Sequence, residues 1–319
     1  MIRATPALRG RRGAAHPLPN ARARASFATM TGTLLSLGHG YSARALAARL
    51  LPQGWTVIGT TRDPDKLGSL AETGIEPILW DREAVERALA RADHLLMSAA
   101  PGDEGDPALA LARDTIAARA PNIRWAGYLS TTGVYGDADG AWIDERAPLN
   151  AHSRRGRARV KAEADWAAIP GLPLHIFRLA GIYGPGRGPF AKVREGRAQR
   201  VVKPGQVFSR THVEDIARVL EASIAHPTPG EAFNVCDDEP APPQDVIAHA
   251  AELLGLPIPP EVPFDEADMS PMARSFYADN KRTSNEKVKH MLDLEMRYPT
   301  YREGLAALLR ETEGDSGTP

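Results

Sequence analysis

The sequence predicts an α/β protein built on a doubly wound parallel sheet, with a small, mainly helical lid at the carboxyl edge of that sheet. Three observations carry this prediction: a strand, glycine turn and helix over residues 33–47, a regular alternation of strand-like and helix-like segments up to residue 180, and the loss of that rhythm afterwards. Strands separated by helices of about ten to fifteen residues are typical of parallel sheets, because each crossover needs a covering helix.

The glycine turn is the most informative part of the chain. Residues 33–37 are apolar enough for a strand, and the G-x-G-x-x-A run that follows opens an alanine-rich helix. The first glycine permits a tight turn, the second leaves room for a phosphate beside the backbone, and the alanine lets the helix pack close to the strand. The start of that helix favours a pyrophosphate. The motif therefore predicts a dinucleotide site formed by Gly38, His39, Gly40, Tyr41 and Ala43, with a solvent-facing loop position as the alternative for His39.

The alternation continues through five further strands and the helices between them. We expect strands at 55–60, 75–80, 93–98, 123–130 and 172–179, and helices at 64–73, 83–90, 107–119 and 153–169, with Pro64 at the first position of its helix. Beyond Ala180, a helix at 213–226 and a strand at 232–235 are expected to return to the core. The predicted organisation is a Rossmann dinucleotide-binding domain over 31–180 and a lid over 181–319.

Composition narrows the class of partner. Residues 1–30 hold six arginines and no acid, and are interpreted as a disordered arginine-rich tail, either a transit peptide or an over-extended gene start. Without them the net charge changes from −1 to −7, with 33 basic residues against 40 acidic ones, which argues against nucleic acid or an anionic membrane as partner. No run of 18 apolar residues predicts a membrane span. The single cysteine, Cys236, excludes an internal disulfide and fits a cytoplasmic location.

The end of the second strand indicates which dinucleotide is preferred. An NAD site usually places an acid here for the ribose 2′-hydroxyl, whereas an NADP site supplies an arginine for the 2′-phosphate. Thr60 and Thr61 are neutral, and Arg62 follows directly. Asp63 beside it keeps a solvated loop arginine as the alternative. The pattern favours NADP(H) over NAD(H), bound by Thr61 and Arg62.

Four later motifs complete a set with the glycine turn. They are Ser130-Thr-Thr-Gly-Val-Tyr-Gly136, Arg178-Leu-Ala-Gly-Ile-Tyr-Gly-Pro-Gly-Arg187, Thr211-His-Val-Glu-Asp-Ile-Ala217 and Glu231-Ala-Phe-Asn-Val235. In this order they resemble the extended short-chain dehydrogenase/reductase superfamily, of the NAD-dependent epimerase/dehydratase type, over residues 31–312. The resemblance implies that Asp81 approaches the adenine and that Gly184 borders the nicotinamide and the substrate. It also implies a cofactor lining of Ser98, Ala99 and Ala100.

The resemblance breaks at the catalytic helix. Family enzymes pair a Ser or Thr on the fifth strand with a Tyr-x-x-x-Lys segment, whose tyrosine exchanges a proton during hydride transfer. Thr131, with Thr132 beside it, matches the hydroxyl position, and Lys161 matches the lysine that holds the nicotinamide ribose. Arg157 stands where the tyrosine is expected. Arginine stays protonated near neutral pH and cannot serve as the general acid.

Three interpretations of this departure remain open. Either Tyr135 or Tyr183 supplies the phenol, unless both are structural aromatics packed against the lid. Alternatively, Arg157 and Lys161 bind an anionic group of the substrate, unless they only belong to a basic helix face. In the third interpretation no hydride moves, and the chain is a catalytically silent NADP(H)-sensing protein.

The lid also departs from nucleotide-sugar enzymes. Phe208 stands four residues before His212, where those enzymes carry an arginine for the diphosphate, although Arg210 is close. We therefore expect an atypical NADP(H)-dependent oxidoreductase acting on a small carbonyl or hydroxy compound, with a nucleotide-sugar epimerase or dehydratase as a further alternative. Scattered histidines predict no metal site, and only the resemblance suggests a homodimer. The expected substrate contacts are Thr132, Arg157, Gly184 and Arg210.

Overall fold

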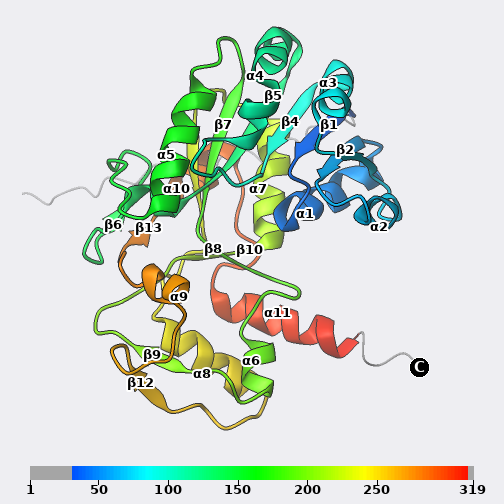
Figure 1. Ribbon diagram of the computed structural model, residues 1–319. Coiled ribbons are helices and arrows are strands. Elements are labelled where there is room, and N and C mark those ends of the chain that lie inside the picture. Colours follow the sequence, from blue (N-terminus) through cyan, green and yellow to red (C-terminus); the bar gives the residue numbers. More distant parts are fainter. Residues whose placement is uncertain (1–30, 315–319) are drawn as a thin grey trace, which may run out of the picture. The chain divides into compact units, whose positions relative to one another are not determined.

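A seven-stranded parallel sheet lies at the centre of the structure, a computed structural model that describes residues 31–314 (Figure 1). The predictions for residues 1–30 lie outside the described part. The strand order is β11-β7-β5-β4-β1-β2-β3. In chain order the strands are β1 (Thr33–Leu37), β2 (Thr56–Thr61), β3 (Glu76–Leu79), β4 (His94–Met97), β5 (Trp125–Thr131), β7 (Leu174–Leu179) and β11 (Ala232–Val235). The predicted doubly wound Rossmann sheet is confirmed.

Helices cover both faces of this sheet, and each face buries its own apolar core. One face carries α1 (Tyr41–Leu50), α7 (Val213–Ala225) and α10 (Glu286–Leu292), which pack around Leu34, Phe177 and Phe233 of the strands. The other carries α3 (Arg82–Arg91), α4 (Pro107–Arg119) and α5 (Arg154–Ala167), which pack around Leu35 and Tyr128. Alternate residues of one strand thus face opposite cores, as a pleated strand requires.

The predicted elements are found with small shifts at their ends. The helix at 107–119 and the strand at 232–235 have the predicted bounds, and α7 and β11 return to the central sheet as expected. One detail is wrong: α2 (Lys66–Ala71) begins two residues after Pro64, so this proline precedes the helix instead of starting it. Asp65 takes the capping position.

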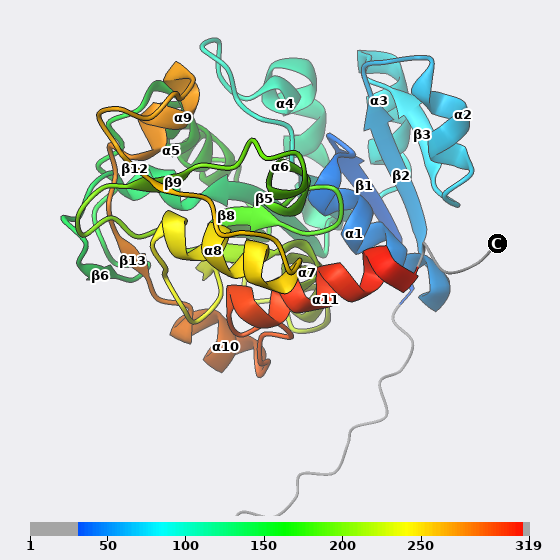
Figure 2. The ribbon, with the colours of Figure 1, turned by 90° about the horizontal axis from the view of Figure 1, so that it is seen from below.

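The lid contains more strand than the sequence suggested. Its helices are α6 (Phe190–Arg194), α8 (Pro243–Leu253), α9 (Pro271–Phe276) and α11 (Tyr301–Gly314), and α8 and α11 lie side by side (Figure 2). Three parallel strand pairs join them: β8 (Gly181–Tyr183) with β10 (Arg210–His212), β9 (Arg200–Val202) with β12 (Glu261–Pro263), and β6 (Trp142–Ile143) with β13 (Arg282–Thr283). The expectation of a mainly helical lid is therefore corrected to helices with small sheets.

The lid elements follow the carboxyl end of β7 and gather in the lower half of Figure 1. Residues 31–314 belong to one compact unit, so the boundary at residue 180 stays a prediction. Within the described range, no helix combines the length and the apolar character that crossing a membrane demands.

Candidate functional site

A cavity lined by described residues lies at the carboxyl ends of β1, β2 and β4. Its volume is about 420 Å³, within the range of about 300–1,000 Å³ that small-molecule and cofactor sites occupy. A ligand here would meet the glycine turn, as expected at the switch point of a doubly wound sheet. The lining residues are Gly38, His39, Gly40, Thr60, Thr61, Arg62, Asp63, Lys66, Trp80, Ser98, Ala99, Ala100 and Pro107.

The geometry of the turn explains its first glycine. Gly38 has a φ of +90°, and a Cβ there would lie 2.6 Å from the backbone nitrogen of Ala99. Its N–H donates to Thr60 Oγ1 at 2.7 Å, and its carbonyl accepts from the Ser98 hydroxyl. Thr60 in turn donates to the carbonyl of Ser36 at 3.1 Å. Thr60 and Ser98 therefore fix the turn between them, and the role of Thr60 was not foreseen.

The second glycine leaves the helix start open. A Cβ on Gly40 would meet nothing closer than 4.0 Å, and no side chain caps α1. Ala43 is buried beneath the turn. An uncapped helix start with free N–H groups suits a pyrophosphate, so these residues fit a dinucleotide.

His39 corrects one expectation. Its side chain is only 8% exposed and packs against Gly59, where a Cβ would lie 2.7 Å from the imidazole Cγ. Neither ring nitrogen has a hydrogen-bond partner in the described part of the chain. Burial, helped by the charge of Arg44, lowers the pKa of His39 to about 4. The residue is thus a neutral, buried wall of the cavity, not a solvent-facing loop residue.

Arg62 is an exposed cation on the cavity wall, and no described residue forms an ion pair with it. Lys66 lines the same wall, but it pairs with Asp63 at 3.2 Å. Asp63 therefore interacts with the lysine and leaves the guanidinium of Arg62 available.

The position of Asp81 differs from the expectation. That carboxylate caps α3, accepting from the N–H of Ala84 at 2.9 Å. The preceding residue, Trp80, lines the cavity. The aromatic residue at the end of β3 could have indicated this part of the cavity wall from the sequence. The resemblance instead directed the prediction to the neighbouring acid, Asp81.

Thr131 and Thr132 lie at the carboxyl end of β5. The Thr131 hydroxyl accepts from the N–H of Gly133 at 3.1 Å and so caps the short 3₁₀ helix η3 (Thr132–Tyr135). The first turn of α5 passes very close, since a Cβ on Gly156 would lie 2.8 Å from the carbonyl oxygen of Gly133. Both threonines are partly exposed, and neither lines the cavity at the glycine turn or the smaller cavity of the lid.

The face of α5 that covers the sheet is not the one expected. Lys161 is 66% exposed and pairs with Asp165 at 2.5 Å, while exposed Arg157 donates to the carbonyl of His152. The cation that α5 turns inward is Arg159, which donates to the carbonyl of Leu129. Lys161 and Arg157 lie about 200° around the helix from Arg159, at 100° per residue. The structure therefore does not bring Lys161 to the cavity at the glycine turn, where the resemblance placed it.

Tyr135 belongs to a buried polar network. Its hydroxyl donates to Asn234 Oδ1 at 2.7 Å and accepts from Arg178 Nη1 at 2.9 Å. Arg178 also pairs with Glu163 at 2.8 Å, and Glu163 accepts from Ser130 at 2.5 Å. Burial raises the pKa of Tyr135 to about 12. The Tyr135 hydroxyl is therefore buried in the core, with both hydrogen bonds made to protein partners.

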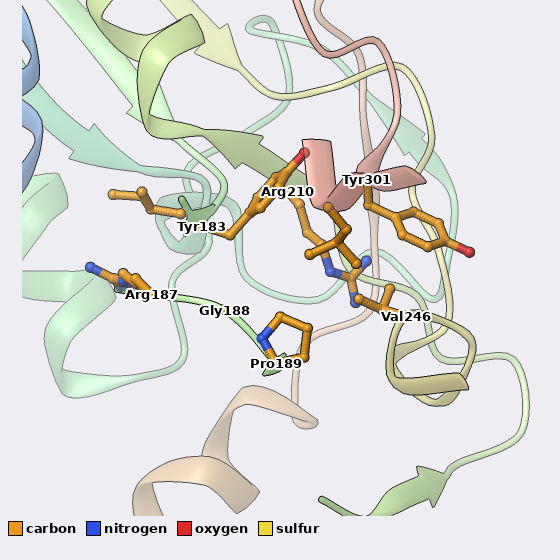
Figure 3. Close-up of a pocket in the computed structure, with 9 residues that line it drawn as sticks. Tyr183, Arg187, Gly188, Pro189, Arg210, Val246 and Tyr301 are labelled. Carbon is orange, nitrogen blue, oxygen red and sulfur yellow. The ribbon is translucent and has the colours of Figure 1, made fainter. Parts of the chain in front are cut away.

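A smaller cavity lies within the lid, between β8, α8 and α11. Tyr183, Arg187 and Arg210 border it, and Gly184 lies in the same turn as Arg187. The ring of Tyr183 forms part of the wall, but its hydroxyl points toward α11, where a Cβ on Gly304 would clash with it (Figure 3). Burial raises the pKa of this phenol too.

Residues 35–236 match the NAD dependent epimerase/dehydratase family. The chain belongs to this family. Protein YeeZ of Escherichia coli (strain K12) is 31% identical over 241 residues, covering 70% of this chain and 84% of YeeZ. A solved structure of a functionally unknown conserved protein from Silicibacter pomeroyi DSS is 60% identical, with a TM-score of 0.84, over 90% of this chain and 100% of that one. A 3-diazoavenalumate denitrifying reductase from a Streptomyces species is 29% identical over 182 residues, covering 51% of this chain and 58% of that protein.

As a member of the epimerase/dehydratase family, the chain has most of its predicted cofactor residues in one cavity, whereas its predicted catalytic residues line neither cavity. Of the residues predicted around the glycine turn, 38–40 line one cavity together with Thr61, Arg62 and the 98–100 segment, whereas Tyr41 and Ala43 lie outside that lining. Arg210 lies in the second cavity, whereas Lys161, Arg157 and Tyr135 do not enter either lining.

Proposed function

We propose that this chain is an NADP(H)-dependent oxidoreductase acting on a small substrate. The observation that carries the proposal is Arg62, an unpaired guanidinium in a cavity whose floor is the glycine turn. A 2′-phosphate next to Arg62 would gain a charge-assisted contact that a 2′-hydroxyl cannot match. The partly exposed ring of Trp80 offers an apolar face for the adenine.

Reductive chemistry is supported by kinship with the Streptomyces reductase. A bound nicotinamide would supply or accept the hydride. Thr131 and Thr132 would orient the substrate oxygen from the carboxyl end of β5. The hydroxyl of Tyr135 already donates one hydrogen bond and accepts another within the protein. Water would therefore carry the proton to or from the substrate.

A second function is favoured by one observation. The residue expected to hold the nicotinamide ribose, Lys161, faces away from the cleft in an ion pair with Asp165. A protein that binds NADP(H) without reacting it and reports redox state to a partner would need neither this lysine nor a phenol. A nucleotide-sugar substrate is disfavoured, because the small cavity of about 170 Å³ lies below the range of about 300–1,000 Å³ typical for larger ligands.

Cofactor choice is tested with Arg62→Ala, using Arg87→Ala as control, since Arg87 is an exposed arginine paired with Glu83 on α3. Isothermal titration should show NADPH affinity falling about 10- to 100-fold in Arg62→Ala, the equivalent of losing a hydrogen bond to a charged group, with NADH affinity nearly unchanged. Equal losses for both dinucleotides would contradict the NADP(H) assignment.

Turnover separates the oxidoreductase from the silent binding protein. NADPH oxidation is followed with a panel of small aldehydes, ketones and conjugated acids. The oxidoreductase requires consumption that Thr131→Ala abolishes and that Thr115→Ala, on α4, leaves intact. Tight NADPH binding with no consumption across the panel would favour the silent protein instead.

A further inference from the structure

The smaller cavity has apolar walls and one half-buried cation. It holds about 170 Å³ and lies between β8, α8 and α11 (Figure 3). The side chains of Ile182, Val246 and Leu305 and the rings of Pro189 and Tyr301 form most of its surface. Arg210 supplies the charge.

Arg210 is held at only one of its nitrogens. Nη1 donates to the carbonyls of Phe208 at 2.8 Å and Ala241 at 3.0 Å. Nε and Nη2 have no protein partner among residues 31–314. In Figure 3 the guanidinium lies among the residues that line the cavity, beside Val246.

Among residues 31–314, no acid forms an ion pair with Arg210. Burial lowers the pKa of this guanidinium, and the acid that acts on it most strongly is Asp237. Asp237 is itself 3% exposed and forms no ion pair with Arg210 within 4.0 Å, and burial raises its pKa to about 8. Near neutral pH Asp237 thus keeps its proton. The other groups that act on Arg210 are the phenols of Tyr183, Tyr277 and Tyr301, which carry no charge.

A cation that is half withdrawn from water and has no counter-ion carries a desolvation cost that nothing offsets. An anion that entered the cavity would remove that cost and satisfy two N–H groups at once. The free edge of a guanidinium matches the two oxygens of a carboxylate.

We propose that this cavity binds a small monocarboxylate, with its carboxylate on Nε and Nη2 of Arg210 and its apolar body against Ile182, Val246 and Leu305. The inference goes beyond the proposed function, because neither Thr131 nor any residue of the cofactor cavity lines this one. A dianion is a poorer match, because Arg187 at the rim points away from Arg210 (Figure 3) and leaves a single cation inside.

The cavity also adjoins the cofactor side of the molecule. Arg187 in its rim lies over the ring of Tyr41, 5.9 Å from the ring centre, and the Tyr41 hydroxyl donates to the carbonyl of Pro185 at 3.0 Å. One turn, residues 184–187, therefore separates the acid from the glycine loop.

The test uses the full chain and calorimetric titration with benzoate and butyrate, each against its amide, and with inorganic phosphate. The acids should bind at least tenfold more tightly than benzamide and butyramide, since a charge-assisted pair is worth about 1.5–3 kcal/mol. Arg210→Gln should erase that preference, whereas Arg187→Gln should keep it. Val246→Phe, which leaves Arg210 in place and fills the cavity, should also abolish acid binding.

Equal binding of acids and amides, an unchanged preference in Arg210→Gln, or tighter binding of phosphate than of benzoate would overturn the proposal. Circular dichroism and NADPH titration of the same samples separate the possible failures. Acid binding without NADPH binding contradicts the proposed function alone, and NADPH binding without acid binding contradicts this inference alone. Should Arg210→Gln not fold, Val246→Phe decides.

Discussion

Buried polar side chains without partners occur at both cavities. Both nitrogens of His39 and both carboxyl oxygens of Asp237 lack hydrogen-bond partners within the described residues. Burial moves their pKa values in opposite directions, to about 4 for the imidazole and about 8 for the carboxyl. Each group is therefore neutral near pH 7. The charge that remains for a ligand is carried by Arg62 in one cavity and Arg210 in the other.

Asp237 makes the stability of the protein depend on pH in a defined direction. The unfolded chain ionises this carboxyl near pH 4, whereas the folded chain keeps the proton up to about pH 8. The folded state therefore binds one more proton than the unfolded state between these pH values. The contribution of Asp237 to the free energy of unfolding accordingly falls as pH rises, by at most about 1.4 kcal/mol per pH unit.

The variant Asp237→Asn should not show this decrease in the free energy of unfolding with rising pH. Urea unfolding at pH 6.5 and pH 8 is informative, because the buried histidines contribute equally to wild type and Asp237→Asn and cancel when the two are compared. We expect the wild type to lose on the order of 1 kcal/mol more than Asp237→Asn across this window. Glu83→Gln, which removes an exposed partner of Arg87, serves as control and should keep the wild-type slope. Parallel slopes for wild type and Asp237→Asn would contradict the raised pKa.

The helix α5 shows what a sequence pattern can and cannot predict about an element. Its existence and approximate ends followed from the sequence, and Ser153 caps it through the N–H of Gly156. Its orientation did not follow, because a helix with cations on several sides offers more than one register. Tertiary partners decide the register: Arg159 finds the carbonyl of Leu129, and Glu163 finds Arg178.

The two ion pairs of α5 should differ sharply in their value to stability. Glu163 and Arg178 are 4% and 7% exposed, and removing one partner of a buried pair costs about 3–5 kcal/mol. Lys161 is 66% exposed, and an exposed pair one helical turn apart contributes about 0.3–0.5 kcal/mol. Urea unfolding should therefore show a large loss for Glu163→Ala and almost none for Lys161→Ala.

Lys161→Ala also tests the placement of this residue. NADPH affinity should stay at the wild-type value, because the ammonium does not reach the cofactor cavity. A loss of more than tenfold in NADPH affinity would mean that the resemblance had placed Lys161 better than the structure does.

At the scale of the whole molecule, the central sheet was predictable and the lid was not. Each strand of the sheet is bounded by a local change from strand-like to helix-like residues, so a single sequence reports it. The strands of the lid are two or three residues long and pair across large separations, for example Trp142 with Arg282. No short-range sequence pattern predicts such a pair. The same limit applies to the small cavity, whose lining spans from Ile182 to Leu305.

The turn at 184–187 connects the two cavities and predicts that their ligands bind cooperatively. A dinucleotide on the glycine loop would restrain Tyr41, whose hydroxyl holds the carbonyl of Pro185 and whose ring lies under Arg187. The rim of the small cavity would then be ordered before the acid arrives, which lowers the entropic cost of binding. Benzoate affinity should therefore rise in the presence of saturating NADPH, and NADPH affinity should rise by the same factor with saturating benzoate.

Tyr41→Phe isolates the contribution of one hydrogen bond to this coupling. The phenyl ring keeps the contact with Arg187, and only the bond to the carbonyl of Pro185 is lost. A bond of this kind is worth about 0.5–1.5 kcal/mol, so the coupling factor should fall about 2- to 10-fold while each ligand alone keeps nearly its wild-type affinity. The four titrations are NADPH with and without benzoate in each protein. A coupling factor that is the same in wild type and Tyr41→Phe would show that the turn does not transmit the order of one site to the other.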